Sequence, residues 1–150
     1  MNMAAHIRAG YLNYAQYSGR TPRPEYWAFV AFLFVAQLLS FLIAPMLAAV
    51  FALVSVLPGL AAASRRFHDV GRSGWWLVLP AVVVPGWLLI WISSAAAAMA
   101  VRVDRLDNDI YFLAASAVML VVVALMLVWL IAPSQPGPNK YGPNPNEVPQ

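Results

Sequence analysis

The sequence contains no cysteine, and only 10% of its 150 residues carry a charged side chain. The absence of cysteine excludes disulfide bonds, thiolate catalysis and thiolate metal ligands, and it leaves the redox compartment open. The low charge, with a hydrophobic fraction of 62%, leaves too little polar surface to keep a domain of this size dispersed in water. We therefore predict that the chain resides in a lipid bilayer, as one domain over residues 1–150.

Charged side chains are missing from long stretches of the chain. The longest covers residues 26–64, which as a single helix would measure about 58 Å, nearly twice the roughly 30 Å thickness of the hydrocarbon core. Two helices must share this stretch, and Pro45, which has no N–H to donate, favours a tight hairpin between them. One tilted span followed by a re-entrant segment is the alternative.

Two further uncharged runs cover residues 73–101 and 110–133. None of the runs alternates polar and apolar residues as the strands of a membrane barrel do, so helices are predicted throughout. We predict an all-α polytopic membrane protein with four transmembrane helices, which cover residues 27–44, 46–64, 74–101 and 110–132. The first run begins late, is long and lacks a small-residue cleavage site, so we expect no removed signal peptide.

The two ends of the chain are predicted to lie outside the spans. Met3, Ile7, Tyr11 and Tyr14 recur at helical spacing, which fits a short interfacial helix on the membrane surface. A packed lead-in to the first span fits the spacing equally well. From residue 133 to residue 150, repeated proline and asparagine disfavour helix and sheet, so this segment is predicted to be a disordered, flexible tail.

Basic residues are divided unequally between the two sides of the membrane. Seven fall on the side of the two termini: Arg8, Arg20, Arg23, Arg65, Arg66, Arg72 and Lys140. Only Arg102 and Arg105 fall on the other side. By the positive-inside rule, both termini and the loop over residues 65–72 are predicted to be cytoplasmic.

The segment RRFHDVGRSGWW, residues 65–76, is the most distinctive in the chain. His68 beside Asp69 suggests a general base or a metal ligand, but sequence neighbours rarely point at one centre, and neither a nucleophile nor a third ligand is close. We predict no catalytic residue, no metal site and no cofactor. The simpler explanation is helix capping, with Arg65 and Arg66 placed favourably against the dipole at the end of the second span. Because His68 falls in a predicted interfacial loop, we expect His68→Ala to leave the fold intact.

Ionisable side chains are absent from the predicted spans, which counts against an ion-driven pump but does not exclude a channel. Pro58 and Pro80 each lie roughly 10 Å along the helix from the arginine-rich loop, so freed carbonyls there are candidates to line a small pocket. Simple kinks for packing are the commoner cause of such prolines. On the outer side, residues 102–109 resemble a cation loop but lack the glycine and final glutamate of a calcium-binding hand.

Three separated motifs, YLNYAQYSGRTPRPEYW, RRFHDVGRSGWW and PGPNKYGPNP, occur in this order over most of the chain. Together they resemble the bacterial membrane family called domain of unknown function 805. The resemblance implies a small inner-membrane protein without an established biochemical role, and it makes no residue catalytic. The matching positions are Ser18, Gly19, Arg20, Arg23, Glu25, Tyr26, Trp27, Arg65, Arg66, His68, Asp69, Gly71, Arg72, Ser73, Gly74, Trp75, Trp76, Asn139, Tyr141, Gly142 and Pro143.

A hairpin of the first two spans returns the first two motifs to one interface. We predict that they form a single cytoplasmic binding cluster, in which five arginines exceed two acidic residues by three charges. Such a cluster is expected to attract an anionic phospholipid headgroup or an acidic protein partner, with Arg66 and Arg72 as the leading contacts. Its members are Arg20, Arg23, Glu25, Arg65, Arg66, His68, Asp69 and Arg72.

The sequence thus favours a non-enzymatic binding or structural module. A homo-oligomer that acts as a small channel or transporter is the alternative. Nucleic acid is not an expected partner, because the basic residues are spread over short loops and form no basic helix or arm.

Overall fold

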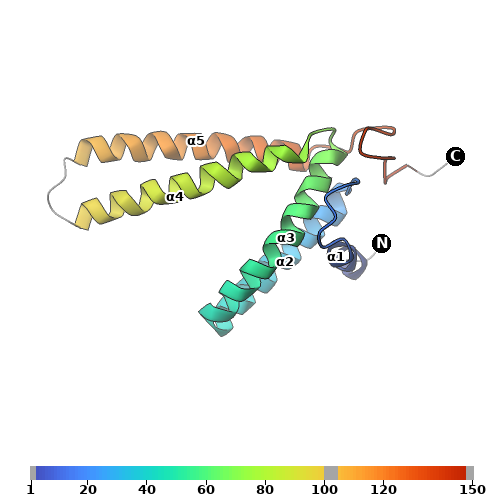
Figure 1. Ribbon diagram of the computed structural model, residues 1–150, viewed down its shortest axis with the longest axis horizontal. Helices are drawn as coiled ribbons and strands as arrows, with labels where there is room; N and C mark the ends of the chain where they lie inside the picture. The colour runs from blue at the N-terminus through green and yellow to red at the C-terminus, as the bar shows by residue number, and fades with distance from the viewer. Residues whose placement is uncertain (1–2, 100–104, 148–150) are drawn as a thin grey trace. The chain divides into compact units, whose positions relative to one another are not determined.

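The computed structural model describes the backbone of residues 3–99 and 105–147 and the side chains of residues 3–96 and 110–147. The described residues form five α-helices and one short 3-10 helix (Figure 1). Four of the α-helices are long and apolar enough to cross a membrane. The predicted class, an all-α membrane protein with four spans, is confirmed. The elements are α1 (Met3–Leu12), α2 (Arg23–Ile43), α3 (Pro45–Asp69), η1 (Gly74–Leu77), α4 (Val78–Met99) and α5 (Arg105–Ile131).

The packing divides the chain into two compact units. Unit 1 consists of Met1–Gly74 and Trp129–Gln150, and unit 2 consists of Trp75–Val128. Unit 1 therefore joins the first three helices to the last residues of α5 and the segment that follows them. Two of the three sequence motifs lie wholly in unit 1, and the third, RRFHDVGRSGWW, lies in it up to Gly74.

In unit 1, α2 and α3 form the predicted tight hairpin (Figure 1). Only Ala44 separates the two helices, in an extended conformation with φ −161° and ψ 134°. Its N–H donates to the carbonyl of Ser40, which closes the last turn of α2. Pro45 begins α3, where a missing N–H costs nothing because the first amides of a helix have no intrahelical partner. Two complete helices are therefore present in place of the re-entrant alternative.

Helix α1 packs against α2, as the lead-in interpretation proposes. Gly10 is buried because its missing side chain makes room for the ring of Phe29. The ring of Tyr11 meets Phe29 and Phe32 edge to face, with centroids 5.4 and 5.9 Å apart. Such pairs add roughly 0.5–1.5 kcal/mol beyond the area they bury.

Proline 58 lies inside α3, and the helix continues through it. A proline at this position cannot donate to the carbonyl four residues earlier, which belongs to Val54. The hydroxyl of Tyr14, which follows α1, donates to that carbonyl over 3.1 Å. The carbonyl of Val54 is thus satisfied by a side chain of the same unit. It is not free to line a pocket, as the sequence had suggested for carbonyls near Pro58.

Helix α3 ends later than predicted. The sequence placed residues 65–72 in a loop after a span ending at residue 64, but α3 continues to Asp69. That boundary was wrong, because the polar side chains of the last turn have partners inside unit 1 and need no water. Arg65, Arg66 and Asp69 are all buried.

In unit 2, α4 and α5 lie side by side and run in opposite directions (Figure 1). The indole N–H of Trp87 on α4 donates to the hydroxyl of Ser116 on α5 over 3.1 Å. Helix α4 continues through Pro85. The predicted third span ends at Val101, and its last two residues lie outside the described residues. The side chains of the suspected cation loop, 102–109, also lie outside them.

Candidate functional site

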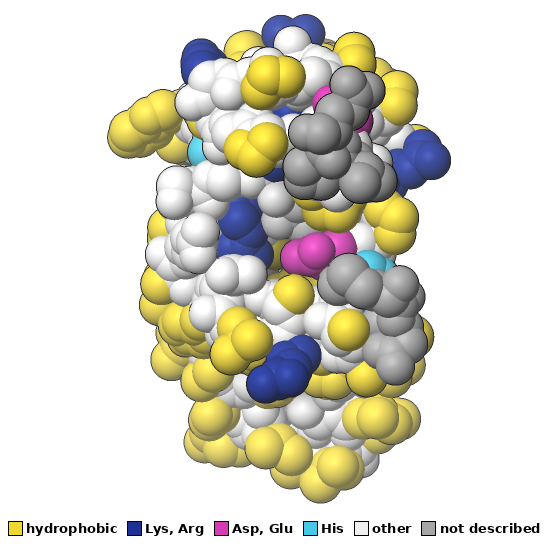
Figure 2. Space-filling view, turned by 90° about the vertical axis from the view of Figure 1, so that its right-hand side faces the viewer, with side chains coloured by type: hydrophobic (Ala, Val, Ile, Leu, Met, Phe, Trp, Pro, Cys, Tyr) yellow, Lys and Arg dark blue, Asp and Glu magenta, His cyan; other side chains and the backbone are white. Residues whose placement is uncertain are grey.

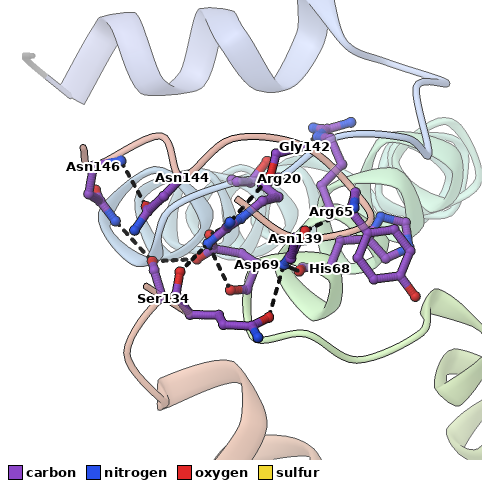
Figure 3. Close-up of polar contacts among 12 residues, drawn as sticks. Arg20, Arg65, His68, Asp69, Ser134, Asn139, Gly142, Asn144 and Asn146 are labelled. Carbon is purple, nitrogen blue, oxygen red and sulfur yellow. Dashed lines mark hydrogen bonds and ion pairs between the residues drawn. The ribbon is translucent and has the colours of Figure 1, made fainter. Parts of the chain in front are cut away.

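The last turn of α3 is the place where all three motif regions meet. The chain before α2, the end of α3 and the segment after α5 converge there, as Figure 3 shows. We call this the arginine junction and define it by its four buried charged residues and the carbonyls that they bind. The charged members are Arg20, Arg65, Arg66 and Asp69.

Asp69 is the centre of the junction, and its side chain is fully buried. Arg20 Nε lies 3.1 Å from Oδ1 of Asp69, and Arg66 Nη1 bonds the other carboxylate oxygen. The hydroxyl of Ser134 also donates to that second oxygen. Within the described residues these are the two ion pairs, and both belong to Asp69. One buried carboxylate therefore serves two buried guanidinium groups.

Arg66 caps the end of α5. Its Nε donates to the carbonyl of Leu130 over 3.0 Å, and Nη2 donates to the carbonyl of Ala132. Arg23 Nη1 donates to the carbonyl of Ile131 over 3.0 Å. The last carbonyls of a helix have no intrahelical partner and carry the negative end of its dipole, so cations are favourable there. The prediction that Arg65 and Arg66 cap the end of their own helix was therefore wrong, because Arg66 caps the end of α5.

Arg65 performs a similar task for the turn after α1. Its Nε donates to Thr21 Oγ1 over 3.0 Å, and Nη1 donates to the carbonyls of Asn13 and Gln16. The carbonyl of Arg65 accepts from the N–H of Thr21 over 3.2 Å, which ties the α2 entry to the end of α3. Arg65 is only 3% exposed. Its guanidinium group therefore binds acceptors inside unit 1.

The segment after α5 is irregular, as predicted, but it is not a free tail. Helix α5 ends at Ile131. Beyond it, the N–H of Gln135 donates to the carbonyl of Asp69 over 2.8 Å. An isolated antiparallel bridge joins Asn139 to Gly142. We call residues 134–147 the strap. The backbone of the strap is ordered by polar groups of the junction that its composition alone does not reveal.

His68 lies on the last turn of α3 and not in a loop. Its ring stacks on Tyr141 of the strap, with centroids 3.7 Å apart and planes 6° apart. Nδ1 lies 3.2 Å from the carbonyl of Gly19, and the carbonyl of His68 accepts from Asn139 Nδ2 over 3.0 Å. These contacts make His68 a packing residue of the strap.

Four predicted site residues lie outside the buried junction, namely His68, which stacks on the strap, and Arg23, Glu25 and Arg72. Arg23 and Arg72 are exposed, and Glu25 is half-buried in the first turn of α2. Arg72 lies over the indole of Trp129, 5.0 Å from the ring centroid. The structure therefore splits the predicted cluster into a buried core and an exposed edge. Arg66 was predicted as a leading headgroup contact, but it is 0% exposed, so its guanidinium faces carbonyls and not lipid.

The polar side chains around Asp69 are occupied by ion pairs and hydrogen bonds with one another. Ser134 is the hydroxyl nearest Asp69, but Asp69 is paired with two arginines and Ser134 also accepts from Asn146 Nδ2. In the part of the chain that the structure describes, no group of three or more His, Cys, Asp or Glu residues is placed to hold a metal ion. In the strap, the N–H of Gly137 and the amide of Asn144 lower the pKa of Glu147 by hydrogen bonding its carboxylate.

Residues 14–143 match the profile of the family described as Protein of unknown function (DUF805). The chain belongs to this family. Inner membrane protein YhaI of Escherichia coli (strain K12) is 42% identical over 85 residues, covering 52% of this chain and 72% of YhaI. Inner membrane protein YhaH of the same organism is 33% identical over 96 residues, covering 57% of this chain and 79% of YhaH. No solved structure matches this chain.

This DUF805 protein is an integral inner-membrane protein. The family match includes the junction from Arg20 through the end of α3 to Gly142, and Asn13, whose carbonyl binds Arg65, lies one residue before it. Sequence reasoning missed the polar partners that complete it. They are Thr21, Ser134, Gln135 and Asn139. Ser134, Gln135 and Asn139 lie in the proline- and asparagine-rich segment that was interpreted as disordered, and Thr21 lies in the first motif.

His68 of this DUF805 protein provides a first test. His68→Ala removes a stacked ring at the end of α3 but no ion pair, so we expect the membrane helices to remain and the protein to accumulate as the parent does. The loss of stacking should cost about 0.5–1.5 kcal/mol. Accumulation in the membrane and the free energy of unfolding in detergent measure it. Loss of the protein from the membrane would show that His68 supports the helices themselves.

Proposed function

We propose that this DUF805 protein is a non-catalytic binding module whose arginine-rich face is cytoplasmic and holds anionic phospholipid headgroups. The observation that supports the proposal is that some basic side chains bind acceptors inside the protein while others are exposed. Arg20, Arg65 and Arg66 are bound by internal acceptors, whereas Arg8 on α1 is exposed, as are Arg23, Arg72 and Lys140. We call the latter three the exposed cations.

The exposed cations are not neutralised by acidic groups of the described chain. Asp69 is committed to the buried arginines. In the described parts of unit 1, seven Lys and Arg residues face three Asp and Glu residues, which leaves a clear positive excess. On the face drawn in Figure 2, Lys and Arg side chains form separate patches among apolar ones. Separate cations beside apolar surface suit lipid headgroups better than a continuous polyanion.

Aromatic side chains accompany two of the exposed cations at the end of α5. Trp27 Nε1 donates to the carbonyl of Leu130 over 3.3 Å, close to the carbonyl of Ile131 that binds Arg23. Arg72 lies over Trp129. Indole and guanidinium groups together favour the headgroup level of a membrane, where amphipathic rings settle and basic residues gain about 1 kcal/mol each from anionic lipid.

Lipid retention tests this proposal. The variant Arg23→Gln, Arg72→Gln should retain several-fold less anionic phospholipid than the parent after purification in mild detergent, and retention by the parent should fall as salt rises. The matched control is Arg102→Gln, Arg105→Gln, which removes the same charge from the side of the membrane predicted to be opposite the exposed cations. Mass spectrometry of bound lipid gives the measurement. Equal, salt-insensitive retention in all three proteins would remove the lipid proposal and leave a protein partner for these charges.

The proposal includes an orientation, with both termini in the cytoplasm. It is supported by the seven-to-two division of basic residues and by the even number of spans. A reporter fused after Gln150 is expected to be active only as a cytoplasmic enzyme, and one inserted at Asn108 only as a periplasmic enzyme. The reverse result at either position would contradict the orientation and move the exposed cations to the outer leaflet.

A further inference from the structure

We propose that the end of α3 and the strap form a guanidinium-binding cradle, occupied by the chain's own Arg20, which latches the strap to the α2–α3 hairpin. The inference goes beyond lipid binding and does not depend on it. It begins from the surroundings of Arg20, whose side chain is 1% exposed although it carries a permanent charge. Among the residues that the structure describes, every hydrogen-bond partner of that guanidinium is an oxygen of Asp69 or of the strap backbone.

Five oxygen atoms converge on this one group. Nε donates to Oδ1 of Asp69 over 3.1 Å, and Nη2 donates to the carbonyl of the same residue over 3.3 Å. Nη2 also donates to the carbonyl of Gln135 over 2.6 Å. Nη1 donates to the carbonyls of Gly137 and Gly142 over 2.8 and 3.4 Å. Figure 3 shows Arg20 between Asp69 and the strap.

The strap backbone is shaped to present these carbonyls. Gly137 has φ 68° and Gly142 has φ 132°, values that side chains with a Cβ rarely adopt. The bridge between Asn139 and Gly142 closes the loop between them. The two glycines therefore let the chain reverse direction and bring two carbonyls to the same nitrogen of Arg20.

The cradle requires a guanidinium and not merely a positive charge. A guanidinium has five N–H donors in a planar fork, and here all three of its nitrogens donate to separate acceptors. A lysine ammonium is a single point with three donors and cannot reach acceptors spread around a plane. Because the strap contributes only carbonyls to Arg20, this contact depends on strap conformation and not on strap side chains.

Loss of Arg20 is expected to leave the oxygen-lined cradle intact but empty. The strap would keep its other contacts, among them the bond from Gln135 N–H to Asp69 and the stack of Tyr141 on His68. It would therefore detach more often without being lost. A small guanidinium ion from solution has the charge, the plane and the donors to occupy the vacated place.

The single lysine of the chain reports on the strap. Lys140 lies in the strap, so an endoproteinase specific for lysine cuts the protein at one place. Cleavage requires the strap to leave its docking place, and under limiting protease the cleavage rate follows the detached population. Arg20→Ala should raise that rate about tenfold, which corresponds to about 1.4 kcal/mol of lost docking free energy. Arg20→Lys should lie close to Arg20→Ala.

Chemical rescue then separates a guanidinium site from a general charge effect. Ethylguanidinium at about 10 mM, far below the molar range in which guanidinium unfolds proteins, should restore protection to Arg20→Ala. Ethylammonium at the same concentration and ionic strength should not. Protection of Arg20→Ala equal to that of the parent would overturn the latch, and failure of ethylguanidinium to rescue would overturn the guanidinium specificity of the cradle.

A second variant covers the case in which Arg20→Ala fails to accumulate. Gly142→Ala keeps Arg20 and places a Cβ at φ 132°, which should turn its carbonyl away and raise cleavage several-fold. Pro143→Ala changes the neighbouring exposed residue and should cleave like the parent. Unchanged cleavage in Gly142→Ala would overturn the proposal. Lipid retention by the parent and these variants is expected to be equal, so failure of the latch and failure of lipid binding remain distinguishable.

Discussion

Replacement of Asp69 by Asn is expected to destabilise the protein by about 3–5 kcal/mol, the usual cost when one partner of a buried ion pair is removed. The substitution preserves size but removes the charge that faces Arg20 and Arg66. It also turns donor N–H groups of the amide toward donor N–H groups of the arginines. Two buried guanidinium groups would then lack a counter-ion, and we expect poor accumulation in the membrane and a lowered unfolding midpoint in detergent.

Glu147→Gln is the matched control for Asp69→Asn, since it neutralises an exposed carboxylate of the same unit. It should accumulate and unfold like the parent. If Asp69→Asn alone were as stable as the parent, the junction would not depend on charge pairing, and its carbonyl contacts would be sufficient.

Replacement of Gly10 by Ala is expected to destabilise unit 1 by about 1–3 kcal/mol through overpacking. A Cβ at this position would lie 2.8 Å from Cγ of Phe29 and closer still to two other ring carbons. The ring cannot move freely, because Tyr11 packs against it edge to face. The free energy of unfolding in detergent measures the effect, and Phe29→Leu in the same chain should recover part of the loss.

Gly86 of α4 provides the control for Gly10, because it is also a glycine within a helix. Apart from its chain neighbours and the backbone of its own helix, no described atom lies within 4 Å of an added Cβ at Gly86. Gly86→Ala should be neutral or stabilise the helix by roughly 0.5–1 kcal/mol, since alanine loses less backbone entropy. If both substitutions had the same sign and size, the contact between α1 and α2 would not be tightly packed.

The proximity of the first two motifs was predicted better than the geometry of their contacts. The hairpin at Pro45 implied that Arg20 and the end of α3 share an interface, and Arg20 does pair with Asp69. Exposure was predicted incorrectly for Arg66, because excess charge was assigned to lipid. A sequence shows that an arginine stands near a helix end but does not show which carbonyls will be within reach after folding.

The sequence by itself determined that this protein resides in a membrane, how many spans it has and where the hairpin lies. These are local properties, since uncharged length and the missing N–H of a proline act on the segment that contains them. Only the tertiary structure decided which arginines are buried, that Arg66 caps α5, and that the strap docks on Arg20. Arg20 and Gly137 are 117 residues apart. Their contact exists only because packing brings the ends of several helices together, and no local pattern of residues encodes that meeting.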